Sequence, residues 1–182
     1  GVFAATFFYD GNTLLPLEQH ATVALPEDDG RVTVWSSTQT PHYLHRALTK
    51  VLGLPASRIR VVATPNGGGF GGKSDPFGHE IVFAAMALKL GRPAKVSLTR
   101  EEVFYCHRGR HPVLMRSRMG LRKDGTITGR HFESLLDGGA YASSSTAVIS
   151  NASAFALGPY RVDNALIEGA VVYTNNPPSG AM

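Results

Sequence analysis

The segment GGGFGGK, residues 67–73, constrains the fold of this chain more than any other stretch, because five of its first six residues are glycine. Glycine loses more backbone entropy on folding than other residues, and five of them exceed what a tight turn requires. Such a run is typical of places where a ligand or a second backbone comes close to the main chain. A strand is predicted before it, over Arg58–Pro65, and an apolar, buried helix after it, over Glu80–Gly91. We therefore expect a glycine loop that joins a strand to a helix.

Followed by Ser74, the glycine loop also matches two phosphate-binding patterns, G-x-x-x-x-G-K-[ST] and G-x-G-x-x-G. Both patterns need a helix that starts at the last glycines, so that its first N–H groups face the phosphates. Here Asp75-Pro76-Phe77-Gly78 intervenes, and Pro76 disfavours helical geometry at Asp75. The helix is therefore expected to begin at about residue 79. A nucleotide-binding P-loop-like module stays an alternative hypothesis, as does a noncatalytic α+β interaction domain that keeps the loop for folding.

The remaining elements follow from periodicity and turn signals. Apolar residues at helical spacing between Pro41 and Gly53 predict a helix over residues 41–52. The Asp124-Gly125 pair is the strongest hairpin signal and predicts a long strand on either side of it. Other strands are predicted over Arg31–Ser37, Ala94–Thr99 and Ala165–Asn175, and other helical segments over Arg100–Cys106 and Ala147–Ala156. This order predicts an α+β fold, with a mixed β-sheet, packed helices and a long antiparallel hairpin.

Charge and cysteine content exclude several classes of protein. The net charge is +4, but the basic residues are spread along the chain, which argues against binding to nucleic acid. No apolar run is long enough to span a bilayer and no signal peptide is recognisable, so we expect a cytoplasmic protein without a membrane contact. The single cysteine, Cys106, excludes an internal disulfide and an iron–sulfur centre held by this chain alone.

The two ends of the sequence are typical of an internal segment. The sequence opens on GVFAATFFYD without an initiator Met, and it stops at NNPPSGAM with no closing helix or tail. We therefore expect residues 1–182 to be one portion of a larger domain, incomplete at both ends.

Several motifs together resemble one family. LPLEQHATVA, SSTQTPH, GGGFGGK, HRGRHP, LRKDGTI, GGAY and YTNNPPSGAM run through most of the chain. They are similar to segments of the molybdopterin-binding (large) subunit or domain of the molybdenum hydroxylases, the xanthine oxidase and aldehyde oxidase family. HRGRHP, GGAY and YTNNPPSGAM most resemble its 4-hydroxybenzoyl-CoA reductase and nicotinate dehydrogenase branch. Gln39 also precedes Phe70 by 31 residues (70 − 39), as the family's molybdenum-side glutamine precedes its loop phenylalanine.

The resemblance implies roles for the glutamine and for the loop. Gln39 would hydrogen-bond an oxygen ligand of molybdenum through its amide, which donates without adding charge. The backbone at Phe70 and Gly71 would pass against the metal centre, and Gly68 and Gly69 would let the pterin come close. Unblocked N–H groups of a glycine loop suit anionic oxygens. Gln39 and Phe70 are thus the residues expected near molybdenum.

The resemblance also implies a reaction. The family hydroxylates an aromatic, heteroaromatic or aldehyde carbon with oxygen from water, and one branch runs the chemistry reductively. Its catalytic glutamate belongs to a later region, so no catalytic residue is expected in this chain, which alone should be inactive. Ser74 and Asn151 stand where xanthine-type enzymes place a substrate glutamate and a substrate arginine. These two residues are therefore expected on the substrate side, and xanthine is not the expected substrate.

The implied cofactor is molybdenum–molybdopterin, as such or in its cytosine dinucleotide form. The resemblance places [2Fe–2S] centres and FAD on other domains or subunits. The expected partners are the remainder of the molybdenum subunit, iron–sulfur and flavin subunits or domains, and a small aromatic or aldehyde substrate.

For four further polar residues, the sequence favours structural roles over catalytic or metal-binding ones. Glu18 and His20 lie in a segment that resembles the family, and structural hydrogen bonding is favoured over a place on the substrate side. His107 and His111 have a four-residue spacing that can bind metal on a helix. The sequence HRGRHP prevents that helix, however, so a positioned loop is favoured over a metal site.

Overall fold

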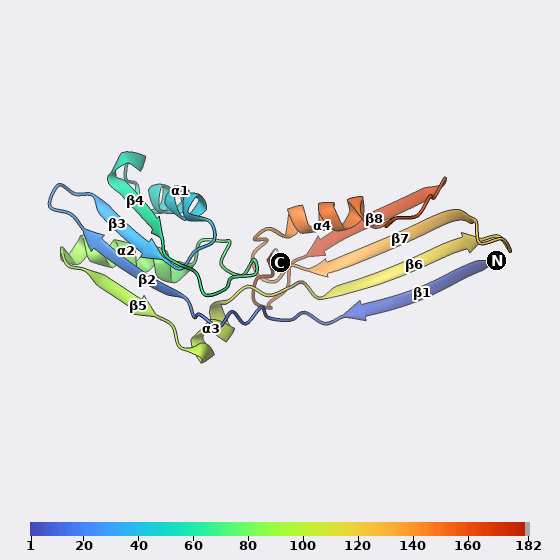
Figure 1. Ribbon diagram of the computed structural model, residues 1–182, viewed down its shortest axis with the longest axis horizontal. Helices are drawn as coiled ribbons and strands as arrows, with labels where there is room; N and C mark the ends of the chain where they lie inside the picture. The colour runs from blue at the N-terminus through green and yellow to red at the C-terminus, as the bar shows by residue number, and fades with distance from the viewer. Residues whose placement is uncertain (181–182) are drawn as a thin grey trace. The chain divides into compact units, whose positions relative to one another are not determined.

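Two four-stranded sheets organise residues 1–180, the part of the chain that the computed structural model describes (Figure 1). Residues 13–108 form one unit, which we call the loop unit because it contains the glycine loop. Residues 1–12 and 109–180 form a second unit, which we call the hairpin unit. Ala181 and Met182, the end of the YTNNPPSGAM motif, lie outside the described residues. The expectation that residues 1–182 are one portion of a larger domain stays a prediction.

The sheet of the loop unit contains one parallel and two antiparallel pairs. Its order is β4-β3-β2-β5, formed by β4 (Ile59–Ala63), β3 (Val32–Ser36), β2 (Ala21–Pro26) and β5 (Ala94–Ser97). β3 and β4 are parallel, and the chain between them forms α1 (Pro41–Leu52) and a short 3-10 helix, η1 (Ala56–Arg58). β2 is antiparallel to both of its neighbours. The parallel pair brings two carboxyl ends to one edge of the sheet, and this edge carries the candidate site.

Helix α1 has the bounds that the sequence predicts, because its start and stop signals are both strong. Pro41 occupies the first turn, where a missing N–H leaves no bond unmade. Gly53 ends the helix in the left-handed conformation, at φ 65°. Leu44 and Leu48 are fully buried on one face of α1. They share a single core with residues of the sheet and of the next helix, namely Ala24, Val32, Val34, Ile59, Ala84 and Ala87.

Helix α2 (Gly78–Leu90) follows the glycine loop and is buried on one face only. Ala84 and Ala87 pack into the core, whereas Val82, Met86 and Leu90 are between 41% and 62% exposed. The expectation of a buried helix is therefore wrong for its outer face. An all-apolar sequence has no polar stripe, so it does not indicate which face of the helix has a neighbour.

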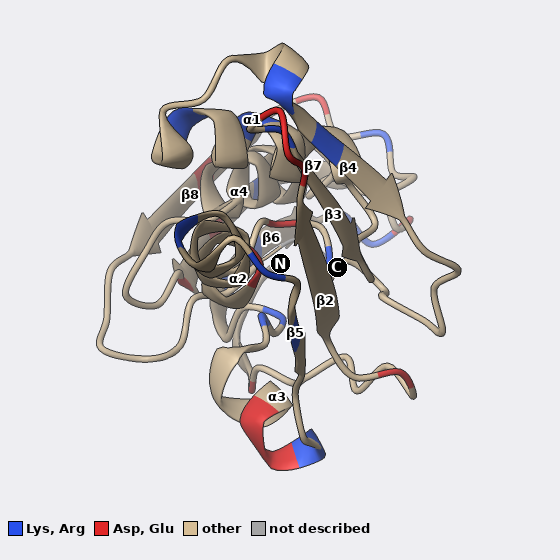
Figure 2. Ribbon diagram, turned by 90° about the vertical axis from the view of Figure 1, so that its left-hand side faces the viewer, with Lys and Arg blue, Asp and Glu red and all other residues tan. Residues whose placement is uncertain are grey.

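Charged residues are distributed over helices, strands and loops rather than gathered on one element (Figure 2). The short helix α3 (Arg100–Cys106), predicted as a helical segment, is an example, because Arg100 stands beside Glu101 and Glu102. Thr99 caps this helix by accepting a hydrogen bond from the N–H of Glu102. Within residues 1–180, no helix has the length and apolar character needed to cross a membrane.

The sheet of the hairpin unit is built around the predicted hairpin. Its order is β1-β6-β7-β8, formed by β1 (Val2–Tyr9), β6 (Val113–Leu121), β7 (Ile127–Asp137) and β8 (Ala165–Val172). β1 and β7 are antiparallel to β6, whereas β8 is parallel to β7. Asp124 and Gly125 lie in the turn, with Gly125 at φ 88°. Helix α4 (Ser145–Ala154) packs against β8 and β7.

The sequence patterns do not predict strands β1 and β2. The β1 sequence, VFAATFFY, lacks alternation, and its partners lie more than 100 residues later, since Val2 pairs with Gly120 and Tyr9 with Val113. β2 pairs with β3 across the short loop 27–31, and with β5 far along the chain, since Ala21 pairs with Ser97. The pairings of β1 with β6 and of β2 with β5 depend on distant segments, which local patterns do not report. Mixed pairing in both sheets, with packed helices, confirms the α+β fold and the long antiparallel hairpin.

Candidate functional site

Gln39 and the glycine loop meet at the carboxyl ends of strands β3 and β4. β3 ends at Ser36 and β4 at Ala63, and the two strands are parallel neighbours. Each strand is therefore followed, at the same edge of the sheet, by one half of the site. The backbone N–H of Gln39 donates to the carbonyl of Lys73 at 2.9 Å, which joins the two halves directly. The structure thus brings together predicted site residues that are 31 positions apart in sequence, Gln39 and Phe70.

The side-chain oxygen of Gln39 is held by the loop backbone. Its Oε1 accepts hydrogen bonds from the N–H of Gly71 at 3.0 Å and of Lys73 at 3.1 Å. Two backbone donors at the oxygen settle the orientation of the amide, so Nε2 points away from them. Gln39 is exposed, and within residues 1–180 its Nε2 makes no hydrogen bond. The amide therefore offers two N–H donors beside the loop.

The loop backbone adopts a conformation that only a glycine-rich segment reaches readily. Gly68 has φ 105° and Gly71 has φ 88°, both in the region that disfavours side chains. Phe70 lies between them at φ 50°, an uncommon value for a residue with a Cβ. Phe70 is 63% exposed. The loop therefore presents main chain and one aromatic ring to the outside.

The glycines are also required by close packing beneath the loop. A Cβ on Gly69 would lie 2.5 Å from Oε1 of Gln39, and a Cβ on Gly72 would lie 2.1 Å from Cε1 of His107. Real Cβ atoms do not approach other atoms so closely. The side chains of Gln39 and His107 thus occupy the space that side chains on the loop would need. Close approach, the property that the glycine run predicts, is present on the inner side of the loop.

An ion pair between Lys73 and Glu18 anchors the glycine loop to the rest of the loop unit. The Lys73 side chain is 1% exposed, and its Nζ lies 2.5 Å from Oε2 of Glu18. The same carboxylate oxygen accepts a hydrogen bond from the N–H of Gly67 at 3.0 Å. A phosphate loop needs its lysine to reach outward to a nucleotide, whereas this lysine is committed to an internal ion pair. The structural role favoured for Glu18 agrees with these contacts.

Buried histidines support the other side of the loop. His20 is 2% exposed and His107 is 5% exposed, and Nε2 of His20 lies 3.3 Å from Nδ1 of His107. The His20 ring also packs on Phe77, with ring centroids 4.6 Å apart. Burial lowers the pKa of His20 to about 3, and positive charge on His79, His107, Lys73 or Arg100 acts in the same direction. Burial likewise lowers the pKa of His79 to about 4. Both imidazoles are therefore neutral near pH 7.

These histidines predict a loss of stability in acid. Below pH 6.5 His20 becomes protonated in the unfolded chain, whereas in the folded loop unit it stays neutral until the pH approaches 3. Its contribution to the free energy of unfolding is therefore fully present above pH 6.5 and is lost as the pH falls towards 3. The free energy of unfolding is expected to change by about 1.4 kcal/mol per pH unit for each such histidine. Fluorescence of Trp35, the single tryptophan, during denaturation of the 182-residue chain measures this slope.

His20→Gln is the matched variant for this slope. The variant should lower the slope of the free energy of unfolding against pH by the contribution of about one histidine. This expectation is independent of its stability at pH 7. Glu80, whose pKa burial raises, gives an opposite contribution that is the same in both proteins. An unchanged slope between pH 6.5 and 4 would contradict the assignment of a depressed pKa to His20.

The other predicted residues have separate surroundings. Ser74 lies beside the loop, with its Oγ 3.5 Å from Oε1 of Gln39. His111 bonds through Nε2 to Oγ of Ser145 at 2.6 Å, within the hairpin unit. Within residues 1–180, neither His107 nor His111 belongs to a group of three or more side chains that could hold a metal ion. Asn151 is an exposed residue of α4 in the hairpin unit, and its substrate-side role stays a prediction.

Sequence reasoning missed two parts of the site. It did not predict that Lys73 points inward or that His107 packs under Gly72. Lys73 lies 55 residues from Glu18 (73 − 18) and His107 lies 35 residues from Gly72 (107 − 72), and neither spacing carries a periodic signal. A hint was present for Lys73, because a helix displaced to Gly78 leaves no phosphate cradle for a lysine to complete.

Comparison with known proteins gives a consistent result. Residues 1–182 match the molybdopterin cofactor-binding domain family. The large molybdopterin subunit of nicotinate dehydrogenase from Eubacterium barkeri is 39% identical over 165 residues, which cover 91% of this chain and 39% of that subunit. The molybdenum-binding subunit of xanthine dehydrogenase from Escherichia coli is 37% identical over 186 aligned positions, which cover 98% of this chain and 25% of the relative. The chain thus spans well under half the length of these two relatives.

A solved structure supports the same assignment. Quinoline 2-oxidoreductase from Pseudomonas putida 86 superimposes with a TM-score of 0.89 at 27% identity, over 100% of this chain and 24% of that one. The family match covers the glycine loop, Gln39 and both units, so it agrees with the resemblance that the motifs carry. The chain therefore belongs to the molybdopterin cofactor-binding domain family.

Proposed function

We propose that this chain forms part of the molybdenum-cofactor-binding subunit of an oxidoreductase. The enzyme hydroxylates an aromatic, heteroaromatic or aldehyde substrate with oxygen derived from water, or removes such a hydroxyl reductively. One observation carries the proposal: Gln39 gives its Oε1 to the N–H groups of Gly71 and Lys73 and keeps its amide N–H groups free beside the loop. The relatives are a nicotinate dehydrogenase, a xanthine dehydrogenase and a quinoline oxidoreductase.

The residues of the loop fit a molybdopterin group. The outer side of the loop presents main chain with little side-chain bulk, so a planar pterin meets no obstruction from Gly68, Gly69 or Gly71. The amide of Gln39 supplies uncharged donors next to it, which suit an anionic oxygen. When bound, a molybdenum–pterin group, as such or as its cytosine dinucleotide form, supplies two-electron redox chemistry. Gln39 would then hold an oxygen of that group through its amide N–H groups, and the exposed side chain of Phe70 would be available to contact it.

Other parts of the enzyme complete this function. The catalytic glutamate, the [2Fe–2S] centres and FAD belong to other segments or subunits, and residues 1–182 alone are inactive. Ser74 and Asn151 contribute to the substrate side. Ser74 is close enough to Gln39 for its hydroxyl to interact with a ligand next to the amide.

Metal and pterin analysis of the intact subunit tests the proposed function. Protein purified from a host that makes the cofactor is expected to contain about one molybdenum per chain and to release a fluorescent pterin on oxidation. Complete absence of both from active preparations would contradict the proposal. Saturable ATP binding that Lys73→Ala abolishes would favour the nucleotide-binding alternative, although Lys73 is buried against Glu18. Tight binding of a defined protein partner, with neither cofactor nor nucleotide, would favour the interaction domain.

A further inference from the structure

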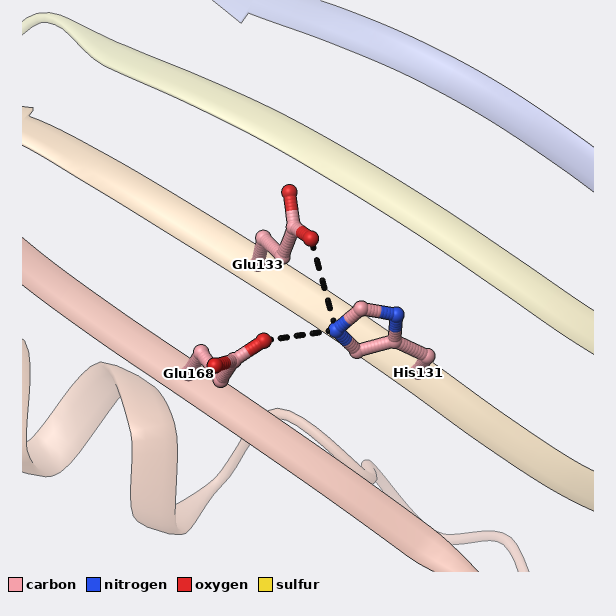
Figure 3. Close-up of side chains that lie close together, drawn as sticks. All are labelled: His131, Glu133 and Glu168. Carbon is pink, nitrogen blue, oxygen red and sulfur yellow. Dashed lines mark hydrogen bonds and ion pairs between the residues drawn. The ribbon is translucent and has the colours of Figure 1, made fainter.

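His131, Glu133 and Glu168 form a cluster in the hairpin unit that the proposed function does not use (Figure 3). Nε2 of His131 lies 2.7 Å from Oε2 of Glu168 and 3.4 Å from Oε1 of Glu133. One ligand atom from each residue lies within 4.8 Å of the others. The two carboxylates thus converge on one nitrogen from two sides, as Figure 3 shows. Within residues 1–180 this is the single group of three metal-ligating side chains at such distances.

The strands place these three side chains together. His131 and Glu133 are two residues apart on β7, so both point to the same face of the sheet. Glu168 pairs directly with Glu133 across the parallel β7–β8 ladder. Ligands on strands are held more precisely than ligands on loops, because the ladder fixes their Cα positions. The cluster is therefore largely preorganised by the backbone.

We propose that His131, Glu133 and Glu168 bind a divalent transition-metal ion, namely Zn²⁺. Two ligand atoms at about 2.0–2.2 Å from one tetrahedral zinc ion stand roughly 3.3–3.5 Å apart. The separations of 2.7 and 3.4 Å around Nε2 approach this spacing, so side-chain rotation alone closes the site. The ion would replace the direct contact between Nε2 of His131 and Oε2 of Glu168. Three protein ligands leave a fourth position for water.

Neighbouring charges define the strength and selectivity of this site. Nη1 of Arg116 lies 3.6 Å from Oε2 of Glu133, which leaves Oε1 for the ion. Arg118 stands opposite His131 in the β6–β7 register. These cations weaken the attraction for a metal, so binding in the micromolar range is expected rather than tighter binding. The imidazole nitrogen favours zinc over Mg²⁺ and Ca²⁺, which prefer oxygen ligands alone.

An ion at this position stabilises the edge of the sheet. β8 is an edge strand, bonded to β7 alone within its sheet. Glu133 and Glu168 are like charges placed directly opposite each other, a pairing that weakens a ladder. A divalent cation between them reverses this effect and links β8 to β7 through side chains. The inference concerns the hairpin unit and does not depend on the proposed function.

Calorimetric titration of the intact subunit with Zn²⁺ alone tests the site. Metal-free wild-type subunit is expected to bind zinc at this site with a micromolar Kd, and Glu168→Gln and His131→Gln should each weaken that binding at least 10-fold. Asp28→Asn is the matched control, because it removes one negative charge from an exposed turn of the loop unit. This control should bind zinc as the wild type does, and Mg²⁺ should give no saturable heat.

Anomalous diffraction from zinc-soaked crystals of the intact subunit gives a second readout that needs no variant. The expected result is a peak within bonding distance of His131 Nε2 and of both carboxylates, together with a zinc-dependent rise in melting temperature that Glu168→Gln abolishes. Equal zinc binding by the wild type and both variants would mean an adventitious ion only and would overturn the proposal. Anomalous density that lies elsewhere in a wild-type crystal would also overturn the proposal. Circular dichroism of the variants shows whether they are folded.

Discussion

Gln39→Glu is expected to leave the glycine loop folded while lowering turnover of the intact enzyme by about 100-fold or more. A carboxylate keeps an oxygen for the N–H groups of Gly71 and Lys73, so the bonds that hold the loop survive. It replaces the free amide donors with a second acceptor and adds a negative charge. Under the proposed function, an anionic oxygen of the cofactor would then face a carboxylate in place of a donor. Steady-state turnover, measured beside molybdenum content per chain, separates loss of positioning from loss of cofactor.

Gln39→Ala is the matched comparison for this experiment. It removes both the donor and the acceptor, so it lowers turnover and also leaves two loop N–H groups without a side-chain partner. A stability loss of about 0.5–1.5 kcal/mol per lost hydrogen bond is expected, because the bond from Gly71 is exposed and that from Lys73 is part-buried, without unfolding of the subunit. Turnover of Gln39→Glu close to that of the wild type would show that the amide donors have no part in the reaction.

Gly72→Ala is expected to disrupt the glycine loop, because the added methyl group overpacks the space next to His107. The added Cβ would lie 2.1 Å from Cε1 and 2.8 Å from Nε2 of His107, and 2.8 Å from Cδ1 of Leu14. Because His107 is 5% exposed and packed against His20, its ring has no open space to enter. Overpacking of this kind costs about 1–3 kcal/mol. Under the proposed function, the displaced loop should also lower the molybdenum content of the intact subunit. Thermal unfolding and metal content of the intact subunit measure both effects.

Gly78→Ala is the control for Gly72→Ala, because it makes the same chemical change six residues later (78 − 72). A Cβ on Gly78 meets nothing within 4 Å, and Gly78 begins α2, where alanine favours the helix. This variant should be as stable as the wild type or more stable. Combining Gly72→Ala with His107→Ala should restore part of the lost stability, because the two changes share one space. Additive losses would show that the ring of His107 is not what excludes a side chain at position 72.

Local signals account for the parts of the fold that sequence analysis predicted well. Pro41 and Gly53 delimit α1, and the Asp124-Gly125 turn positions the hairpin, because each acts through backbone preferences within a few residues. Pro76 similarly delays α2 to Gly78. No such signal marks β1, whose eight exposed residues become a strand by pairing with β6. The same limit explains the outer face of α2, which is apolar in sequence yet exposed.

By itself, the sequence determined that a glycine loop follows a strand and that the loop is not the start of a helix, because glycine and proline have strong dihedral preferences. That Gln39 is the distant counterpart of the loop followed from the resemblance of the motifs to the molybdenum hydroxylases. The tertiary structure alone decided that Lys73 turns inward to Glu18, that His107 fills the space beneath Gly72, and that Gln39 gives its oxygen to the loop. Such contacts join segments separated by tens of residues. The contact of Gln39 with the loop depends on the parallel pairing of β3 with β4, which no local pattern specifies.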